Sequence, residues 1–445
     1  MNSLKDKFSK VGMIIPNILM PRKDVDLQKW AVVACDQYTS EPEYWSSVAE
    51  EVGADPSTLN LIFPEVYLED DDKDQRIERI NAAMEEYLKQ GILEDQGQAF
   101  FLVQRNTPDS PTRWGLMAAL DLEQYDFSKD STSLIRATEG TILDRIPPRK
   151  QIRKNASIEL PHIMVLIDDP EATVIEPLAK NADSLEKIYD FDLMKNAGHI
   201  TGYRVDAAAA LDQIANALQK LADPSVFSKK YGADNVLLFA MGDGNHSLAT
   251  AKSVWEDIKS AGSDDPEIMQ HPARWALVEI ENIYDEGLIF EPIHRVLFNS
   301  DFASFSGELE KLGSVEFTSL STADEVMKRV ASAVDQHIIG YVDAERTGVF
   351  TVKDPAATIA AGTTQTAIDN LVQQEQTSVD YIHGQKATES LGRKPGNIGI
   401  FLPALDKSDF FRTVIHDGAL PRKTFSMGEA HEKRYYIEAR KIKAE

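Results

Sequence analysis

The stretch VLLFAMGDGNHSLATAKSVWE, which spans residues 236–256, contains the three parts of a strand–loop–helix unit. Residues 236–240 form a continuous apolar run, which is typical of a strand buried on both faces of a sheet. Residues 242–245 are turn formers and include two glycines. From residue 247 onward the composition favours a helix with apolar side chains along one side. The pattern therefore predicts a strand, a tight glycine-rich loop and a helix in immediate succession.

Other parts of the chain extend this pattern. Two further apolar runs, residues 163–167 and 276–280, are candidates for buried strands. A helix-rich stretch, residues 206–221, lies between the first of them and the run at 236–240. Strands that alternate with helices indicate a mixed sheet with crossover connections. We therefore predict a mixed α/β (α+β) fold in which helices flank a central mixed sheet.

The chain length predicts several lobes. At about 150 residues per domain, 445 residues correspond to about three domains. We place an N-terminal α/β lobe at residues 1–130, a central lobe with the glycine loop at 131–300, and a C-terminal α/β lobe with a basic tail at 301–445. Because no long linker rich in Pro, Gly or Ser separates them, we expect the lobes to pack as one compact unit.

The composition argues against some function classes. A formal net charge of −25 repels nucleic acid and anionic membranes, so neither is an expected partner. No apolar run approaches the roughly 18–20 residues that span a bilayer. The single cysteine, Cys35, excludes an intramolecular disulfide and fits a reducing compartment. These features predict a cytoplasmic protein with a small anionic partner, and they leave open whether it forms a homo-oligomer.

The glycine loop has the properties of an anion site. The first backbone amides of a helix have no partner within the helix, and with the helix dipole they favour a negative group, phosphate above all. Gly242 and Gly244 permit unusual backbone angles and a close approach of a ligand. Asn245 or Ser247 is predicted to cap the helix. The alternative interpretation is a purely structural helix start.

Two titratable residues lie in the same loop. Asp243 has the chemistry to hold a Mg²⁺ ion or to act as a base, and His246 to contact phosphate or shuttle a proton. In the structural alternative, His246 is packed and hydrogen-bonded.

Two other motifs are incomplete in this sequence. Residues 70–81 lack the glycine and the final glutamate of a calcium-binding loop, and Ser247 replaces the third glycine of a dinucleotide-binding fingerprint.

Two segments, residues 136–154 and 420–443, are basic against the acidic background. Arginine and lysine side chains from both would neutralise phosphate oxygens if the segments converge. The candidates are Arg136, Arg145, Arg422 and Lys423. Glu139, within the first segment, is the candidate general base. The alternative is that these basic residues are ordinary surface charges paired with carboxylates. His162 and Asp36, which lie outside both segments, are weaker candidates for the site.

Five segments together resemble a family known as domain of unknown function 1015, whose name implies no activity. They are ACDQYTS at residues 34–40, RATEG at 136–140, GDGNHSLATAK at 242–252, EPIHR at 291–295 and PRKTFS at 421–426.

The loop is also similar to the Asp-Gly-His-His-Arg turn of the ParB/sulfiredoxin superfamily. In that superfamily, which includes free-serine kinases and nucleotide-hydrolysing switches, the turn binds nucleotide phosphate. Asp243, Gly244 and His246 match by position, whereas Ser247 replaces the arginine. The resemblance implies a ParB/sulfiredoxin-like core, in which one of the basic segments would have to supply the missing charge.

These observations predict a nucleotide-dependent phosphotransferase or nucleotide hydrolase that acts on a small cytoplasmic metabolite. The loop would hold the phosphates of ATP or ADP, and Asp243 would orient Mg²⁺ or the nucleophile. Two alternatives remain open. One is a non-enzymatic sensor of nucleotides or phosphorylated metabolites, and the other is a metal-dependent hydrolase built on Asp243, His246 and a second histidine.

Overall fold

The computed structural model describes residues 3–108, 110–333, 336–374 and 377–444. The chain divides into two compact units: unit 1 consists of residues 1–289 and 428–445, and unit 2 of residues 290–427. This division differs from the three lobes expected from chain length. Strands from both sides of residue 130 pair in one sheet, and the end of the chain returns to unit 1.

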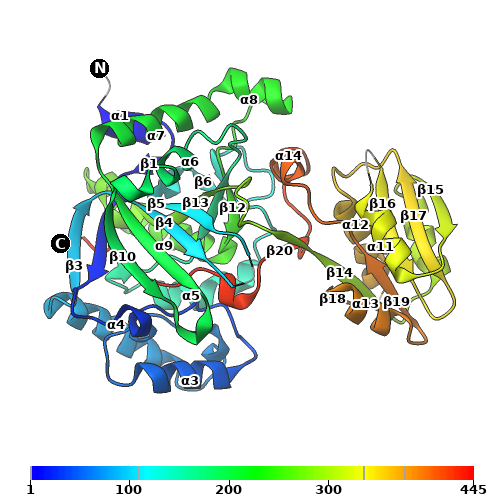
Figure 1. Cartoon of the computed structure of the whole chain (residues 1–445), viewed down its shortest axis with the longest axis horizontal. Coiled ribbons are helices and arrows are strands. Elements are labelled where there is room, and N and C mark those ends of the chain that lie inside the picture. The colour runs from blue at the N-terminus through cyan, green and yellow to red at the C-terminus, as the bar shows by residue number, and fades with distance from the viewer. Residues whose placement is uncertain (1–2, 109, 334–335, 375–376, 445) are drawn as a thin grey trace. The chain divides into compact units, whose positions relative to one another are not determined.

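Unit 1 is built around a ten-stranded mixed sheet with the order β10-β11-β4-β5-β13-β9-β12-β7-β6, in which β1 also pairs with β5 (Figure 1). Parallel pairing joins β13 to β9, β12 to β7 and β7 to β6, and the other pairs are antiparallel. The strands are β1 (Met13–Ile14), β4 (Phe100–Asn106), β5 (Arg113–Asp121), β6 (Tyr125–Asp126), β7 (Ile135–Arg136), β9 (Met164–Ile167), β10 (Glu186–Asp192), β11 (His199–Val205), β12 (Phe239–Asp243) and β13 (Trp275–Asn282). The predicted mixed α/β fold is therefore confirmed.

Helices cover both faces of this sheet. Along β4, Phe100 and Leu102 join one apolar cluster with α1 and α7, whereas Phe101 and Val103 join a second cluster with α3 and α4. Figure 1 shows these two pairs of helices on opposite sides of the sheet. The helices of unit 1 are α1 (Leu4–Ser9), α2 (Leu27–Trp30), α3 (Pro42–Val52), α4 (Lys73–Lys89), α5 (Ile146–Arg153), α6 (Glu176–Ala179), α7 (Ala208–Leu221), α8 (Pro224–Tyr231) and α9 (Asn245–Ala261). In the described residues, no helix combines the length and the apolar character needed to cross a bilayer.

The end of the chain is integrated into unit 1. Two short ladders, β2 (Asn17–Pro21) with β3 (Leu93–Gln98) and β8 (Ile158–Glu159) with β21 (Arg440–Lys441), accompany the main sheet. Arg434 is 2 % exposed, and its guanidinium forms ion pairs with the buried Glu279 (2.8 Å) and Glu438. The basic tail expected to lie on a C-terminal lobe is therefore partly a buried structural segment of unit 1.

Unit 2 contains a seven-stranded antiparallel sheet with the order β15-β17-β16-β19-β14-β18, in which β20 also pairs with β14. Its strands are β14 (Phe290–Phe298), β15 (Ser314–Ser319), β16 (His337–Val342), β17 (Thr347–Lys353), β18 (Ser378–His383), β19 (Asn397–Phe401) and β20 (Phe425–Met427). Its helices are α10 (Phe302–Glu310), α11 (Ala323–Ala331), α12 (Ala360–Gln373), α13 (Gln385–Gly392) and α14 (Lys407–Asp417).

Candidate functional site

The glycine loop forms the turn between β12 and α9. The strand ends at Asp243 and the helix begins at Asn245, which confirms the predicted strand–loop–helix unit. Gly244 joins them with a φ of 81°, a left-handed conformation that L residues rarely adopt. A Cβ atom at this position would lie 3.1 Å from Cγ1 of Ile163. Both the backbone angle and the lack of space therefore favour glycine here.

The first turn of α9 presents backbone donors that nothing in the described part of the chain accepts. The amide of Gly244 donates to Oδ1 of Asp243 at 2.8 Å, and the amide of Leu248 donates to the carbonyl of Gly244 at 3.0 Å. For the amides of residues 245–247, no acceptor is found among the described residues. These three amides lie at the positive end of the helix dipole and are therefore the donors that an anion would use.

The predicted helix caps are wrong. No side chain caps α9, because the helix begins at Asn245 itself, so that Asn245 and Ser247 both lie inside its first turn. Oδ1 of Asn245 instead accepts the backbone amide of Thr138 at 3.1 Å, and Oγ1 of Thr138 donates to the carbonyl of Met241 at 2.6 Å. These bonds hold the segment at residues 136–140 beside the loop.

The guanidinium of Arg136 is occupied by hydrogen bonds to backbone carbonyls. This residue belongs to β7, is buried, and donates from Nε to the carbonyl of Ser133 at 2.7 Å and from Nη2 to the carbonyl of Asn235 at 2.8 Å. The predicted contact of Arg136 with phosphate is therefore not supported, because its guanidinium ties the chain before β12 to the chain before β7. Glu139, the candidate base, follows Thr138 closely in the same segment and is partly exposed.

Asp243 is held by a lysine from the end of the chain. Its Oδ2 lies 3.4 Å from Nζ of Lys433, and its side chain is 28 % exposed. Burial alone would raise the pKa of the Asp243 carboxyl, but Lys433, His162 and the Gly244 amide outweigh this effect and lower it. The carboxylate is therefore ionised at neutral pH.

His246 is a neutral imidazole at neutral pH. Burial, followed by repulsion from Arg149 and Arg145, lowers the pKa of His246 to about 4, although Asp36 acts in the opposite direction. Its Nε2 accepts the backbone amide of Ile142 at 3.3 Å. The single proton of the neutral ring then belongs on Nδ1, which makes that nitrogen a donor.

The two arginines near His246 differ in what they contact. Arg149 forms a two-pronged ion pair with Glu65, with distances of 2.8 and 2.5 Å. Arg145 is exposed and has no ion-pair partner among the residues that the structure describes. Of the predicted phosphate-neutralising residues, Arg145 is therefore the one placed near the loop with its charge uncompensated.

A chain of side chains that sequence reasoning largely missed extends from Ser247. Its Oγ lies 2.7 Å from Nε2 of His162, whose Nδ1 lies 2.8 Å from Oη of Tyr436. The backbone amide of Cys35 donates to the same Tyr436 oxygen at 3.1 Å. The sequence signalled this arrangement only through the pair Pro161-His162 and through the basic segment at residues 420–443, which contains Lys433 and Tyr436 but did not single them out.

Arg422 and Lys423 belong to unit 2, whereas the loop belongs to unit 1. Nη2 of Arg422 forms an ion pair with Asp369 at 2.6 Å, and Lys423 is exposed with a φ of 55°. Neither is therefore among the side chains that the structure places around the loop within unit 1.

Among the described residues, no group of three or more His, Cys, Asp or Glu side chains is arranged to hold a metal ion. Asp243 is the metal ligand that the sequence predicted, and both of its oxygens already have partners, Lys433 and the Gly244 amide. Magnesium commonly binds through one or two carboxylates together with substrate phosphates and water. Among the described residues, Asp243 therefore offers a single carboxylate and not a cage made by the protein alone.

The sequence model of one family, described as Protein of unknown function (DUF1015), matches residues 19–375. The chain belongs to this family. The matched range includes the glycine loop, whereas the last segment of unit 1 lies beyond it. No curated protein matches the chain.

Solved structures also resemble this DUF1015 chain, at low similarity. A conserved hypothetical protein from Pyrococcus furiosus is 10% identical with a TM-score of 0.34, over 74% of this chain and 95% of that chain. A free serine kinase variant in complex with ADP is 9% identical with a TM-score of 0.37, over 76% and 95%. A C-terminally truncated SbnI from Staphylococcus aureus is 9% identical with a TM-score of 0.34, over 72% and 82%.

Proposed function

We propose that this DUF1015 chain binds the phosphate groups of a nucleotide at residues 242–247. In this proposal it catalyses phosphoryl transfer to a small cytoplasmic metabolite, or hydrolysis of the nucleotide. The observation that carries the proposal is the set of three backbone amides at residues 245–247, which have no acceptor among the described residues. Such a helix start at the carboxyl end of a strand is a common position for phosphate in α/β proteins.

The surroundings of the loop support an anionic ligand. The chain carries a formal net charge of −25, yet Lys433 and Arg145 gather near this loop. Burial is the main cause of the low pKa of His246, and the positive charges of Arg149 and Arg145 beside the ring lower it further. A phosphate group would stabilise these charges and would be stabilised by them.

We assign roles to the side chains from their protonation and position. The ionised Asp243 would orient Mg²⁺ or the attacking group, and neutral His246 would donate from Nδ1 to a phosphate oxygen. With its proton on Nδ1, His162 would accept the Ser247 hydroxyl proton at Nε2. Glu139 remains the proposed general base, which would take the proton from the attacking group of the acceptor. Mg²⁺ would neutralise negative charge on the phosphates.

The test is nucleotide turnover by purified protein. ATP and ADP are each incubated with Mg²⁺ and a pool of small metabolites, and phosphorus NMR follows the products. We expect turnover that Asp243→Asn abolishes while nucleotide binding persists, since the backbone amides are unchanged. Lys129→Gln, an exposed change in the same unit, is the control and should leave turnover intact. Absence of nucleotide binding with every combination of nucleotide and metal would overturn the proposal.

A non-enzymatic nucleotide sensor is the second candidate. The closed pair between Asp243 and Lys433 favours it, because a carboxylate that is already neutralised is a weaker base and a weaker metal ligand. Saturable nucleotide binding without turnover of any metabolite, in both the wild type and Asp243→Asn, would establish the sensor and reject the enzyme.

A further inference from the structure

Unit 1 contains a cavity of about 180 Å³ at the end of the sheet opposite to the glycine loop. Because β12 runs antiparallel to β9, the residues that precede β12 lie beside those that follow β9. The cavity is lined at this edge by Leu237 and Leu238 before β12 and by Asp168 and Asp169 after β9. It is therefore distinct from the site at residues 242–247.

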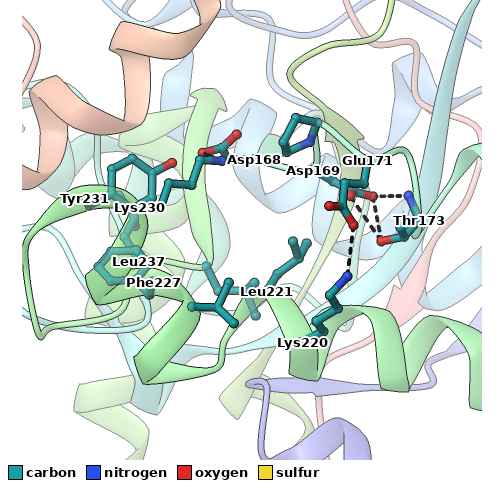
Figure 2. Close-up of a pocket in the computed structure, with 13 residues that line it drawn as sticks. Asp168, Asp169, Glu171, Thr173, Lys220, Leu221, Phe227, Lys230, Tyr231 and Leu237 are labelled. Atoms are coloured by element: carbon teal, nitrogen blue, oxygen red, sulfur yellow. Dashed lines mark hydrogen bonds and ion pairs between the residues drawn. The ribbon is translucent and has the colours of Figure 1, made fainter.

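The walls of this cavity are mainly apolar. Leu221 closes it from the end of α7, Val226 and Phe227 from α8, and Leu237 and Leu238 from the chain before β12. Figure 2 shows Leu221, Phe227 and Leu237 together on one side, with charged side chains on the other. An apolar cavity of ~150 Å³ in another protein accommodates benzene, so a space of this size suits a molecule with one small ring or a branched aliphatic body.

Two buried polar atoms at the cavity have no partner in the described part of the chain: Oδ1 of Asp168 and Oη of Tyr231. The Asp168 side chain is 10 % exposed, and its other oxygen, Oδ2, pairs with Nζ of Lys230 at 2.6 Å. Figure 2 shows Tyr231, Lys230 and Asp168 at the same end of the cavity. A buried polar atom without a hydrogen bond costs free energy, so these two atoms indicate a missing hydrogen-bond partner at this place, and the carboxylate oxygen requires that partner to be a donor.

The remaining charged groups of the lining are satisfied. Asp169 accepts the amides of Thr173 at 2.6 Å and Val174 at 2.8 Å, and Glu171 pairs with Lys220 at 2.9 Å on the exposed rim. The lining thus holds three carboxylates, those of residues 168, 169 and 171, against two lysines. This leaves one negative charge in excess: Lys230 and Lys220 balance Asp168 and Glu171, whereas the charge of Asp169 is held, among the described residues, only by hydrogen bonds from neutral groups such as the Thr173 and Val174 amides.

We propose that this cavity binds a compact apolar molecule that carries one primary ammonium group. The ammonium donates hydrogen bonds to Oδ1 of Asp168 and Oη of Tyr231, since it has three donors and no acceptor. The apolar body packs against Leu221, Phe227 and Leu237. The excess negative charge selects a cation over a neutral or anionic molecule of the same shape.

The test uses benzylammonium as the probe and benzyl alcohol as its neutral match, titrated into the full-length protein by calorimetry and by NMR. We expect saturable benzylammonium binding that is roughly tenfold or more tighter than that of benzyl alcohol, because the alcohol carries no charge and its single O–H donor serves only one of the two polar atoms. Equal binding of the two probes would overturn the proposal. No binding of benzylammonium would also overturn it, and would indicate that Asp168 and Tyr231 form hydrogen bonds only with water.

Variants locate the binding. Asp168→Asn keeps the shape and removes the charge, so it should weaken benzylammonium binding by roughly tenfold or more. Val226 is 43% exposed, so Val226→Trp should block the opening without disturbing the core and should abolish binding of both probes. Asp130→Asn, which changes an exposed carboxylate outside the cavity lining, is the control and should bind as the wild type does. Unchanged binding in Val226→Trp contradicts this location, even if Asp168→Asn fails to fold.

Discussion

At the scale of single residues, Gly244 and His246 carry most of the argument for the loop. Gly244 fixes where the amides of α9 point, because it makes the turn between β12 and the helix in a left-handed conformation. His246 adds a neutral donor whose protonation state depends on its neighbours. The roles of these two residues are tested by separate experiments, one on Gly244 and one on His246.

We expect Gly244→Ala to lower the free energy of unfolding by about 1 kcal/mol or more and to weaken nucleotide binding. The alanine must adopt a φ of 81° with its Cβ 3.1 Å from Ile163. Gly91→Ala is the matched control, since Gly91 also has a positive φ, 65°, but no atom within 4 Å of an added Cβ. Chemical denaturation and nucleotide titration measure both variants. Equal losses of stability and binding in the two would contradict the role assigned to the Ile163 contact.

The pKa of His246 should be about 4 when measured by NMR titration of the folded protein. Because this lies below the ordinary value of 6.5, the unfolded chain binds more protons between these values, and the free energy of unfolding falls as pH drops from 6.5 to 4. Arg145→Gln removes one repelling charge and should raise the pKa of His246. Lys129→Gln should not change it, and a wild-type pKa near 6.5 would refute this account of the site.

At the scale of elements, the local pattern predicted β12, the glycine loop and α9 correctly, because a buried strand and an amphipathic helix follow from neighbouring residues. The same reasoning failed for Arg136, whose carbonyl partner on Asn235 lies 99 residues further along the chain. It also missed Tyr436, which lies 274 residues from His162. Hydrogen bonds between distant segments depend on the sheet topology, which the local pattern does not specify.

The segment at residues 428–445 stabilises unit 1 through Arg434. We expect Arg434→Leu to destabilise the protein by about 3–5 kcal/mol, because it leaves the carboxylates of Glu279 and Glu438 buried without their partner. Lys154→Leu, at an exposed position, is the control. Thermal and chemical denaturation report the difference, and a loss similar to that of the control would show that the ion pairs contribute little.

At the scale of the whole molecule, two units share one chain, and the last segment completes the first of them. We expect removal of residues 428–445 to unfold unit 1, because Tyr435, Tyr436 and Ile437 are almost fully buried in its core. Removal of residues 443–445 alone should be tolerated. Limited proteolysis followed by mass spectrometry distinguishes the two truncations, and a protected unit 1 without residues 428–445 would contradict this integration.

The central claim is that the backbone amides of residues 245–247 bind phosphate. The most direct measurement is an NMR titration of isotope-labelled protein with ADP, with and without Mg²⁺, that follows the amide signals of Asn245, His246 and Ser247. We expect these three signals to move together and to saturate as ADP is added. ADP binding that leaves them unchanged while signals elsewhere move, or no binding at all, would contradict the account.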